Sequence, residues 1–165
     1  REKVEMEYIV LTHAHLDHVW RAQEAQTKFN LKLYMHPEDV YLAQNMSKQA
    51  AMLGLGPFAA DPPRIDGYLN EGDEIVFGKQ RLHIRHAPGH SPGSIVLLSE
   101  KVAVVGDVLF FGSIGRTDLP GGSHEVLLRS IRENLLTLDD EMVILPGHGE
   151  TTTIGFERRS NPFLV

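Results

Sequence analysis

The sequence contains no cysteine in its 165 residues. Disulfide bonds, thiolate nucleophiles and cysteine-based zinc sites are therefore excluded, which leaves imidazole and carboxylate as the strong metal ligands. The absence of cysteine also fits a reducing compartment, so we expect a cytoplasmic protein.

Long apolar runs and a surplus of positive charge are also missing. No apolar stretch approaches the roughly 20 residues of a membrane-spanning helix, and residues 1–7 are too charged for a secretory signal. With 16 Lys and Arg against 22 Asp and Glu, the formal net charge is -6. We therefore expect no nucleic-acid or membrane partner but a small-molecule substrate, while the sequence leaves the oligomeric state open.

Apolar runs separated by turn residues predict one α/β domain, with 42% hydrophobic residues to form its core. Strands are expected at 8–11, 31–35, 74–77, 81–87, 94–98, 102–105 and 142–145. Helices are expected at 19–29, from 36 to about 53, and after Ser123, an N-cap residue. Residues 54–67 and 109–122 are expected to be loops. Trp20 and Phe29 are interpreted as helix core residues.

Four potential metal ligands follow the first expected strand within six positions: His13, His15, Asp17 and His18. A single histidine is more often a satisfied core or surface side chain. Four such groups in one tight loop are hard to explain by packing, because alternate side chains of a loop can converge on one point while their neighbours converge on a second. The loop could therefore supply two metals.

Three later strand ends carry similar side chains. His90 follows the strand at 81–87, Asp107 follows the strand at 102–105, and His148 follows the strand at 142–145. Each alone would be read as a turn or capping residue. Together with the first loop, they predict a site with open coordination positions, whose ligand types suit Zn, Fe, Mn or Co.

The other histidines, at positions 36, 83, 86 and 124, match no metal motif and are expected to be structural. Arg116 and Asp118 are read first as a loop ion pair, which contributes little at a surface. We favour a supporting role for their loop, close to the metals.

The spacing His13-x-His15-x-Asp17-His18, followed in order by Gly89-His90, Gly106-Asp107 and Gly147-His148, resembles the metallo-β-lactamase superfamily. The stretches around Asp107, Arg116 and His148 resemble single-domain glyoxalase II-like hydrolases, that is, hydroxyacylglutathione hydrolases, and the related persulfide dioxygenases. The resemblance implies a four-layer αββα sandwich. It also implies that a first metal is held by His13, His15 and His90. A second metal is then held by Asp17, His18 and His148, and Asp107 bridges the two.

One departure from the family pattern concerns the start of the chain. The strands that precede the histidine-rich motif in the family, and open its first sheet, do not occur before residue 8. We therefore expect residues 1–165 to form one metallo-β-lactamase-fold domain that is incomplete at its N-terminus.

The resemblance implies two divalent ions, first of all zinc, with iron or manganese as alternatives. Two adjacent ions would generate a hydroxide nucleophile near neutral pH, with Asp17 orienting it and Asp107 bridging. The expected reaction is hydrolysis of a small thioester such as an acylglutathione. The alternative is a mononuclear iron persulfide dioxygenase that uses His13, His90 and Asp107. A metal site that serves only folding, and antibiotic hydrolysis, are the less favoured readings.

Overall fold

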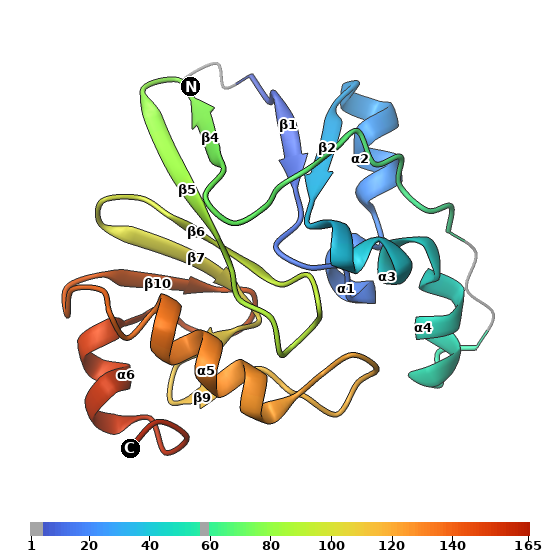
Figure 1. Cartoon of the computed structure of the whole chain (residues 1–165). Coiled ribbons are helices and arrows are strands. Elements are labelled where there is room, and N and C mark those ends of the chain that lie inside the picture. Colours follow the sequence, from blue (N-terminus) through green and yellow to red (C-terminus); the bar gives the residue numbers. More distant parts are fainter. Residues whose placement is uncertain (1–4, 57–59) are drawn as a thin grey trace.

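Two β-sheets face each other at the centre of the molecule, and helices cover the outer side of each (Figure 1). The structure is a computed structural model that describes residues 5–56 and 60–165. Three hydrophobic clusters correspond to the three interfaces of this helix–sheet–sheet–helix arrangement. The expected four-layer fold is therefore confirmed.

The first sheet consists of three parallel strands, β1 (Tyr8–Val10), β2 (Lys32–Met35) and β3 (Gly67–Tyr68), in that spatial order. Its covering layer is formed by α1 (Leu16–Val19), α2 (Ala22–Phe29), η1 (Pro37–Asp39), α3 (Val40–Gln44) and α4 (Met46–Met52). The apolar side chains of β2 and of these helices share one buried cluster.

Both helices expected in this half are broken. The first begins three residues early, at Leu16, and is interrupted before Ala22. The second is interrupted at Asn45, whose side-chain amide donates to the carbonyl of Tyr41 at 2.8 Å. An asparagine side chain that bonds the backbone competes with regular helix geometry, which accounts for the break.

The second sheet has six strands in the order β11-β10-β7-β6-β5-β4. Its members are β4 (Glu74–Phe77), β5 (Gln80–His86), β6 (Ile95–Leu98), β7 (Val102–Gly106), β10 (Val143–Pro146) and β11 (Thr152–Thr153). The predicted hairpin is confirmed, because β4 and β5 pair antiparallel. Among the described strands of this sheet, β10 and β7 pair parallel and the other neighbours pair antiparallel.

Successive side chains of β6 and β7 point to opposite faces of the second sheet, so each strand contributes to two hydrophobic clusters. Ile95 and Leu97 point into the cluster between the sheets, whereas Val96 and Leu98 join the cluster under the outer helices. Those helices are α5 (His124–Asn134) and α6 (Ile154–Ser160). Ser123 caps α5 as expected, accepting a hydrogen bond from the Val126 N–H.

Several details differ from the sequence expectations. The 109–122 segment contains a small hairpin, β8 (Leu109–Phe110) with β9 (Ser113–Ile114), and neither β11 nor α6 was predicted. Trp20 is 50% exposed and Phe29 is 46% exposed, so the helix-core reading was wrong. Part of the expected loop at 54–67 lies outside the described residues, and the remainder is irregular up to β3. None of the described helices has the length and apolarity to cross a membrane.

Candidate metal centre

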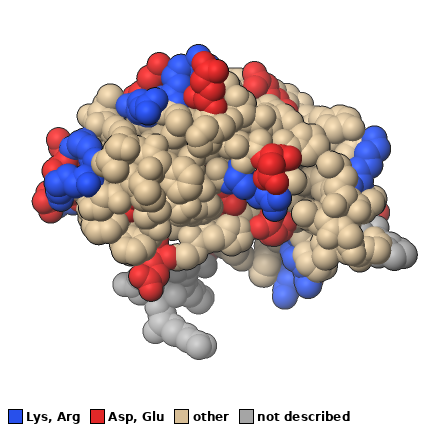
Figure 2. All heavy atoms as spheres, turned by 90° about the horizontal axis from the view of Figure 1, so that it is seen from below, with Lys and Arg blue, Asp and Glu red and all other residues tan. Residues whose placement is uncertain are grey.

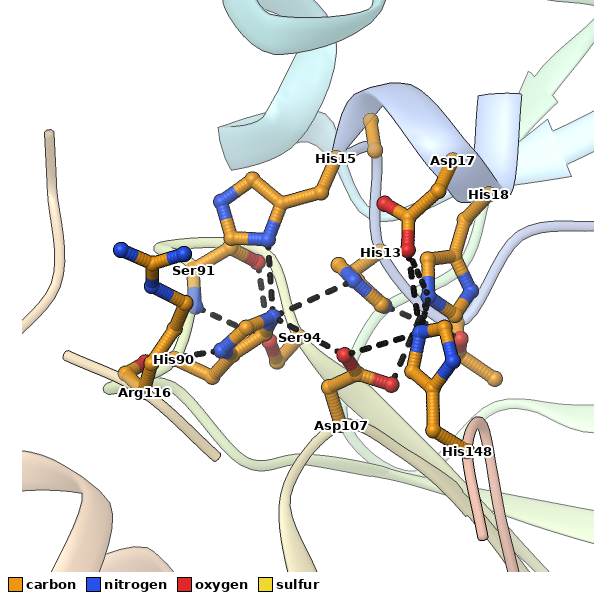
Figure 3. A network of polar contacts seen from close by, with 12 residues as sticks. His13, His15, Asp17, His18, His90, Ser91, Ser94, Asp107, Arg116 and His148 are labelled. Atoms are coloured by element: carbon orange, nitrogen blue, oxygen red, sulfur yellow. Dashed lines mark hydrogen bonds and ion pairs between the residues drawn. The ribbon is translucent and has the colours of Figure 1, made fainter. Parts of the chain in front are cut away.

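Strand ends from both sheets meet at one side of the molecule and bring the seven candidate ligands together (Figures 1 and 3). The histidine-rich loop runs from β1 into α1, so its residues start at the end of the first sheet. Asp107 and His148 follow the parallel neighbours β7 and β10, whose ends are joined by a hydrogen bond from Gly147 N–H to the Gly106 carbonyl at 2.8 Å. His90 lies in the turn between β5 and β6.

His13, His15 and His90 form a buried group that we call the inner half-site. The Nε2 atom of His90 lies 2.7 Å from His15 Nδ1 and 3.2 Å from His13 Nε2. Their exposed fractions are 1%, 6% and 2%, respectively. Three imidazole nitrogens therefore converge on one point that is shielded from water.

Asp17, His18 and His148 form a second group, the outer half-site. The Nε2 atom of His148 lies 3.0 Å from Asp17 Oδ2 and 3.1 Å from His18 Nε2. In contrast to the inner half-site, the side chains of Asp17 and His148 are 58% and 55% exposed. This group faces solvent.

Asp107 lies between the two half-sites (Figure 3). Its Oδ2 atom is 3.6 Å from His90 Nε2 and also 3.6 Å from His148 Nε2. Its Oδ1 atom lies 3.4 Å from His18 Nε2. One carboxylate thus faces a ligand candidate of each half-site, as expected for a bridging residue.

Glycine at position 147 makes this approach possible. A side chain there would collide with Oδ1 of Asp107 and with the ring of His18. The Gly147-His148 pair therefore combines a ligand candidate with the space that the neighbouring strand end needs.

The two half-sites differ in their electrostatics. Burial, reinforced by neighbouring imidazoles, lowers the pKa of His13 well below its usual value and that of His15 to about 4. Burial also lowers the pKa of His90. Burial opposes protonation of His18 as well, but the carboxylates of Asp107 and Asp17 together outweigh it and raise the pKa of His18. The inner imidazoles are therefore neutral at pH 7 and present lone pairs.

The donor set fits divalent metal ions. His90 Nδ1 lies 2.8 Å from the carbonyl of Arg116, which fixes the tautomer with the proton on Nδ1 and leaves Nε2 as a lone-pair donor. Asp107 Oδ1 is buried without a hydrogen-bond partner among residues 5–56 and 60–165. A buried carboxylate oxygen without a hydrogen bond is unfavourable unless a cation is present, so the arrangement matches the chemistry of a metal centre.

A buried carboxylate outside the ligand set holds two of the ligand segments together. Asp39, in η1, is fully buried and accepts hydrogen bonds from Ala14 N–H at 2.8 Å, Ser91 Oγ at 2.7 Å and Gly93 N–H at 2.6 Å. Ala14 separates His13 from His15, and Ser91 follows His90. The sequence offered no signal for this role, because an Asp in the first turn of a helix is unremarkable.

The Arg116–Asp118 pair is found as expected. The Arg116 guanidinium donates to both carboxylate oxygens of Asp118, at 2.7 and 2.8 Å, and both side chains are exposed. This contact lowers the pKa of Asp118 to about 2. The loop also reaches the centre through its backbone, since the carbonyl of Arg116 is the partner of His90.

A hollow of about 610 Å³ opens over the centre. Ligand candidates from both half-sites line it together with Phe110, Ile114, Arg116 and Leu119. The centre therefore has room for a small organic molecule.

Over the described part of the face in Figure 2, Lys and Arg are interspersed with Asp and Glu rather than gathered into a basic patch.

His36 and His86 form a further histidine pair with Glu38 nearby. Their rings stack at 3.9 Å with an angle of 12° between planes. His36 Nδ1 accepts from Glu38 N–H, and His86 Nε2 lies 2.8 Å from the carbonyl of Pro92. Because these ring nitrogens already have backbone partners, we interpret the pair as structural, as the sequence suggested.

Comparison with known proteins identifies the family. The model of the Metallo-beta-lactamase superfamily matches residues 4–148. The hydroxyacylglutathione hydrolase GloC of Haemophilus influenzae is 42% identical over 168 residues, which cover 96% of this chain and 76% of the relative.

Two solved structures are also similar. The crystal structure of BLEG-1 B3 metallo-beta-lactamase has a TM-score of 0.88 and 36% identity, covering 98% of this chain and 78% of that one. The crystal structure of TTHA1623 in a di-iron-bound form has a TM-score of 0.85 and 39% identity, covering 95% and 77%. The seven candidate ligands thus lie in a fold that is known to hold a pair of metal ions.

Proposed function

This chain belongs to the metallo-β-lactamase superfamily, and we propose that it is a binuclear metallohydrolase that cleaves a small thioester such as an acylglutathione. The observation that carries the proposal is the position of Asp107, 3.6 Å from a histidine of each half-site. A carboxylate so placed is suited to hold two cations at once. The superfamily implies divalent ions, of which we propose zinc, with iron or manganese as alternatives.

His13, His15 and His90 would hold one ion, Asp17, His18 and His148 the other, and Asp107 both. Two ions bound by these residues would lower the pKa of water and polarise a carbonyl group. No serine or cysteine nucleophile is then required, which agrees with the absence of cysteine from the chain.

The protein side chains have distinct roles in this proposal. Asp17, whose carboxylate is 3.0 Å from His148 and whose side chain is 58% exposed, faces the solvent side of the centre and would help to orient the attacking water. Asp107 keeps the two half-sites in register. The Arg116 carbonyl fixes the ring of His90 and thereby its tautomer.

A thioester is favoured as substrate for two reasons. A thiolate is a good leaving group, so the reaction needs no strong general acid. Among the described residues that line the hollow, the acids Asp17 and Asp107 are both assigned to the metals. In addition, the relative GloC is named a hydroxyacylglutathione hydrolase. The proposed partner is therefore a small molecule, and the proposal requires neither nucleic acid nor membrane.

β-Lactam hydrolysis is a second candidate, because BLEG-1 is named a B3 metallo-beta-lactamase and shares 36% identity with this chain. A polarised carbonyl and an activated water would serve an amide of a strained ring as well as a thioester. The two candidates differ in the leaving group, and parallel assays separate them.

The deciding experiment combines metal analysis of the purified protein with assays on lactoylglutathione, a chromogenic cephalosporin and glutathione persulfide. We expect close to two transition-metal ions per chain and release of glutathione from the thioester. Greater turnover of the cephalosporin would favour the second candidate. One iron per chain with oxygen consumption on the persulfide would overturn the hydrolase and support a mononuclear dioxygenase.

A further inference from the structure

An apolar groove continues from the hollow over the metal centre into the space beside α3 and α4. The groove has a volume of about 120 Å³. Four residues line both the groove and the hollow: His15, Gln49, Leu53 and Leu119. The groove therefore begins beside a ligand candidate of the inner half-site.

The wall of the groove is tied to the histidine-rich loop. The side-chain amide of Gln49, in α4, donates to the carbonyl of Ala14 at 3.0 Å and to that of Leu42 at 2.9 Å. Ala14 lies between two ligand candidates. The position of α4, and with it the groove, is thus fixed relative to the metal centre rather than set by a free surface segment.

Large apolar side chains are exposed along this groove. Tyr41 is 62% exposed, Met52 62% and Leu53 46%. Isolated exposed apolar residues are common, but several around one cavity mark a binding site for an apolar group. Lys48 and the titratable His15 are the charged or ionisable side chains among the described residues of the groove lining, and the Lys48 ammonium lies over the Tyr41 ring.

We propose that this groove binds the acyl chain of the substrate, and that the preferred thioesters carry apolar acyl groups of several carbons rather than the small polar lactoyl group. This inference rests on the proposed thioesterase function. The two arms of a thioester leave the reacting carbonyl carbon in different directions. A biological thiol carrier is large and charged, which suits the solvent-exposed outer half-site, whereas the small apolar groove suits an alkyl chain.

The test is a comparison of kcat/KM for glutathione thioesters of lactate, acetate, butyrate and hexanoate. Each added methylene that enters an apolar site should raise kcat/KM by roughly fourfold until the groove is filled. Lactoylglutathione should be a poorer substrate than butyrylglutathione. A flat series, or a preference for lactoylglutathione, would overturn the proposal while leaving the thioesterase function intact.

A matched pair of variants assigns the effect to the groove. Met52 and Phe29 are exposed apolar residues at the last positions of α4 and α2, but only Met52 lines the groove. Met52→Glu should abolish the gain in kcat/KM with chain length, because a carboxylate in the groove wall opposes burial of an alkyl chain. Phe29→Glu should keep the full series. An equal loss on all substrates in Met52→Glu would contradict the assignment.

Binding of thioether analogues separates this proposal from the reaction itself. S-hexylglutathione, which has an alkyl chain in place of the acyl group and cannot be hydrolysed, should bind more tightly than S-methylglutathione in calorimetry, and Met52→Glu should remove the difference. If no thioester is cleaved but this difference is seen, the proposed function fails and the groove still binds alkyl chains. Equal affinities, together with a dimer in sedimentation that Met52→Glu dissociates, would show that a second copy of the chain occupies the groove.

Discussion

The inner and outer half-sites use similar side chains in opposite environments. His13, His15 and His90 are at most 6% exposed, whereas the side chains of Asp17 and His148 are more than half exposed. Burial keeps the inner imidazoles neutral, and a neighbouring carboxylate keeps His18 easier to protonate. The inner set is therefore prepared for a cation before it arrives, while the outer set remains in competition with water and protons.

The largest effect is expected from removing the residue that connects the two half-sites. Asp107→Ala should lower metal content at both sites and reduce kcat on a thioester by a factor on the order of 10³ or more, because two adjacent dications lose the anion between them. Bound metal and kcat are measured on samples whose folding is verified by circular dichroism.

Asp118→Ala is the matched carboxylate control. Asp118 pairs with Arg116 at the surface and faces no ligand candidate, so its loss should leave metal content near normal and alter kcat/KM only modestly. If Asp107→Ala retained two metals and near-native turnover, Asp107 would not be the bridge.

A smaller effect is expected from the carboxylate beneath the inner half-site. In Asp39→Asn, an amide N–H must face one of the donors that the carboxylate accepts, namely Ala14 N–H, Ser91 Oγ or Gly93 N–H. The two ligand segments should then separate, weakening the affinity of the inner half-site by about tenfold to a hundredfold. Titration of the metal-free protein with zinc measures this affinity.

Asp66→Asn provides the comparison for Asp39→Asn. Asp66 likewise joins distant segments, accepting from Leu33 N–H at 2.9 Å and Gln26 Nε2 at 3.1 Å, but neither partner is a candidate ligand or adjacent to one. It should lower stability without changing zinc affinity. Equal zinc affinities in both variants would show that Asp39 contributes only to folding.

The half-sites should also differ in how readily they lose metal. With a chelator added in steps, the ion of the outer half-site should leave first, because its ligands are exposed and His18 is the imidazole with the raised pKa. Substituting cobalt for zinc makes each site visible by absorption. Simultaneous loss of both ions would mean that the centre behaves as one cooperative unit.

The smallest effect is the pH dependence of stability in the metal-free protein. His15 has a pKa of about 4 when folded against 6.5 as its usual value, so the unfolded state binds more protons between these values. His13 and His90 shift in the same direction, while His18 shifts in the opposite one. The free energy of unfolding should therefore decrease as the pH falls from about 6.5 to about 4. Urea unfolding at a series of pH values measures it, and a stability that rises over this interval would contradict the burial of the inner imidazoles.

The sequence predicted the parts of the site that depend on local patterns. Most strands were placed to within a residue or two by their apolar runs, and the candidate ligands were recognisable because they follow those strands directly. The contacts of Asp39 were not predictable, since its partners lie 25 to 54 residues away and no local pattern marks them. The break at Asn45 and the short β8–β9 hairpin arise from side-chain and tertiary contacts that override propensity.

The spread of the ligands along the chain has a consequence for its topology. His15 and His90 are 75 residues apart, and His18 and His148 are 130 apart. Bound ions would therefore act as cross-links between distant segments, in a chain whose composition allows no disulfide. A covalent link across about 100 residues restricts the unfolded chain by several kcal/mol, and a metal that binds only the folded state stabilises it in a comparable way. Removal of the ions should loosen the docking of the two sheets before either sheet unfolds, which would appear in hydrogen exchange as early loss of protection in residues 11–19.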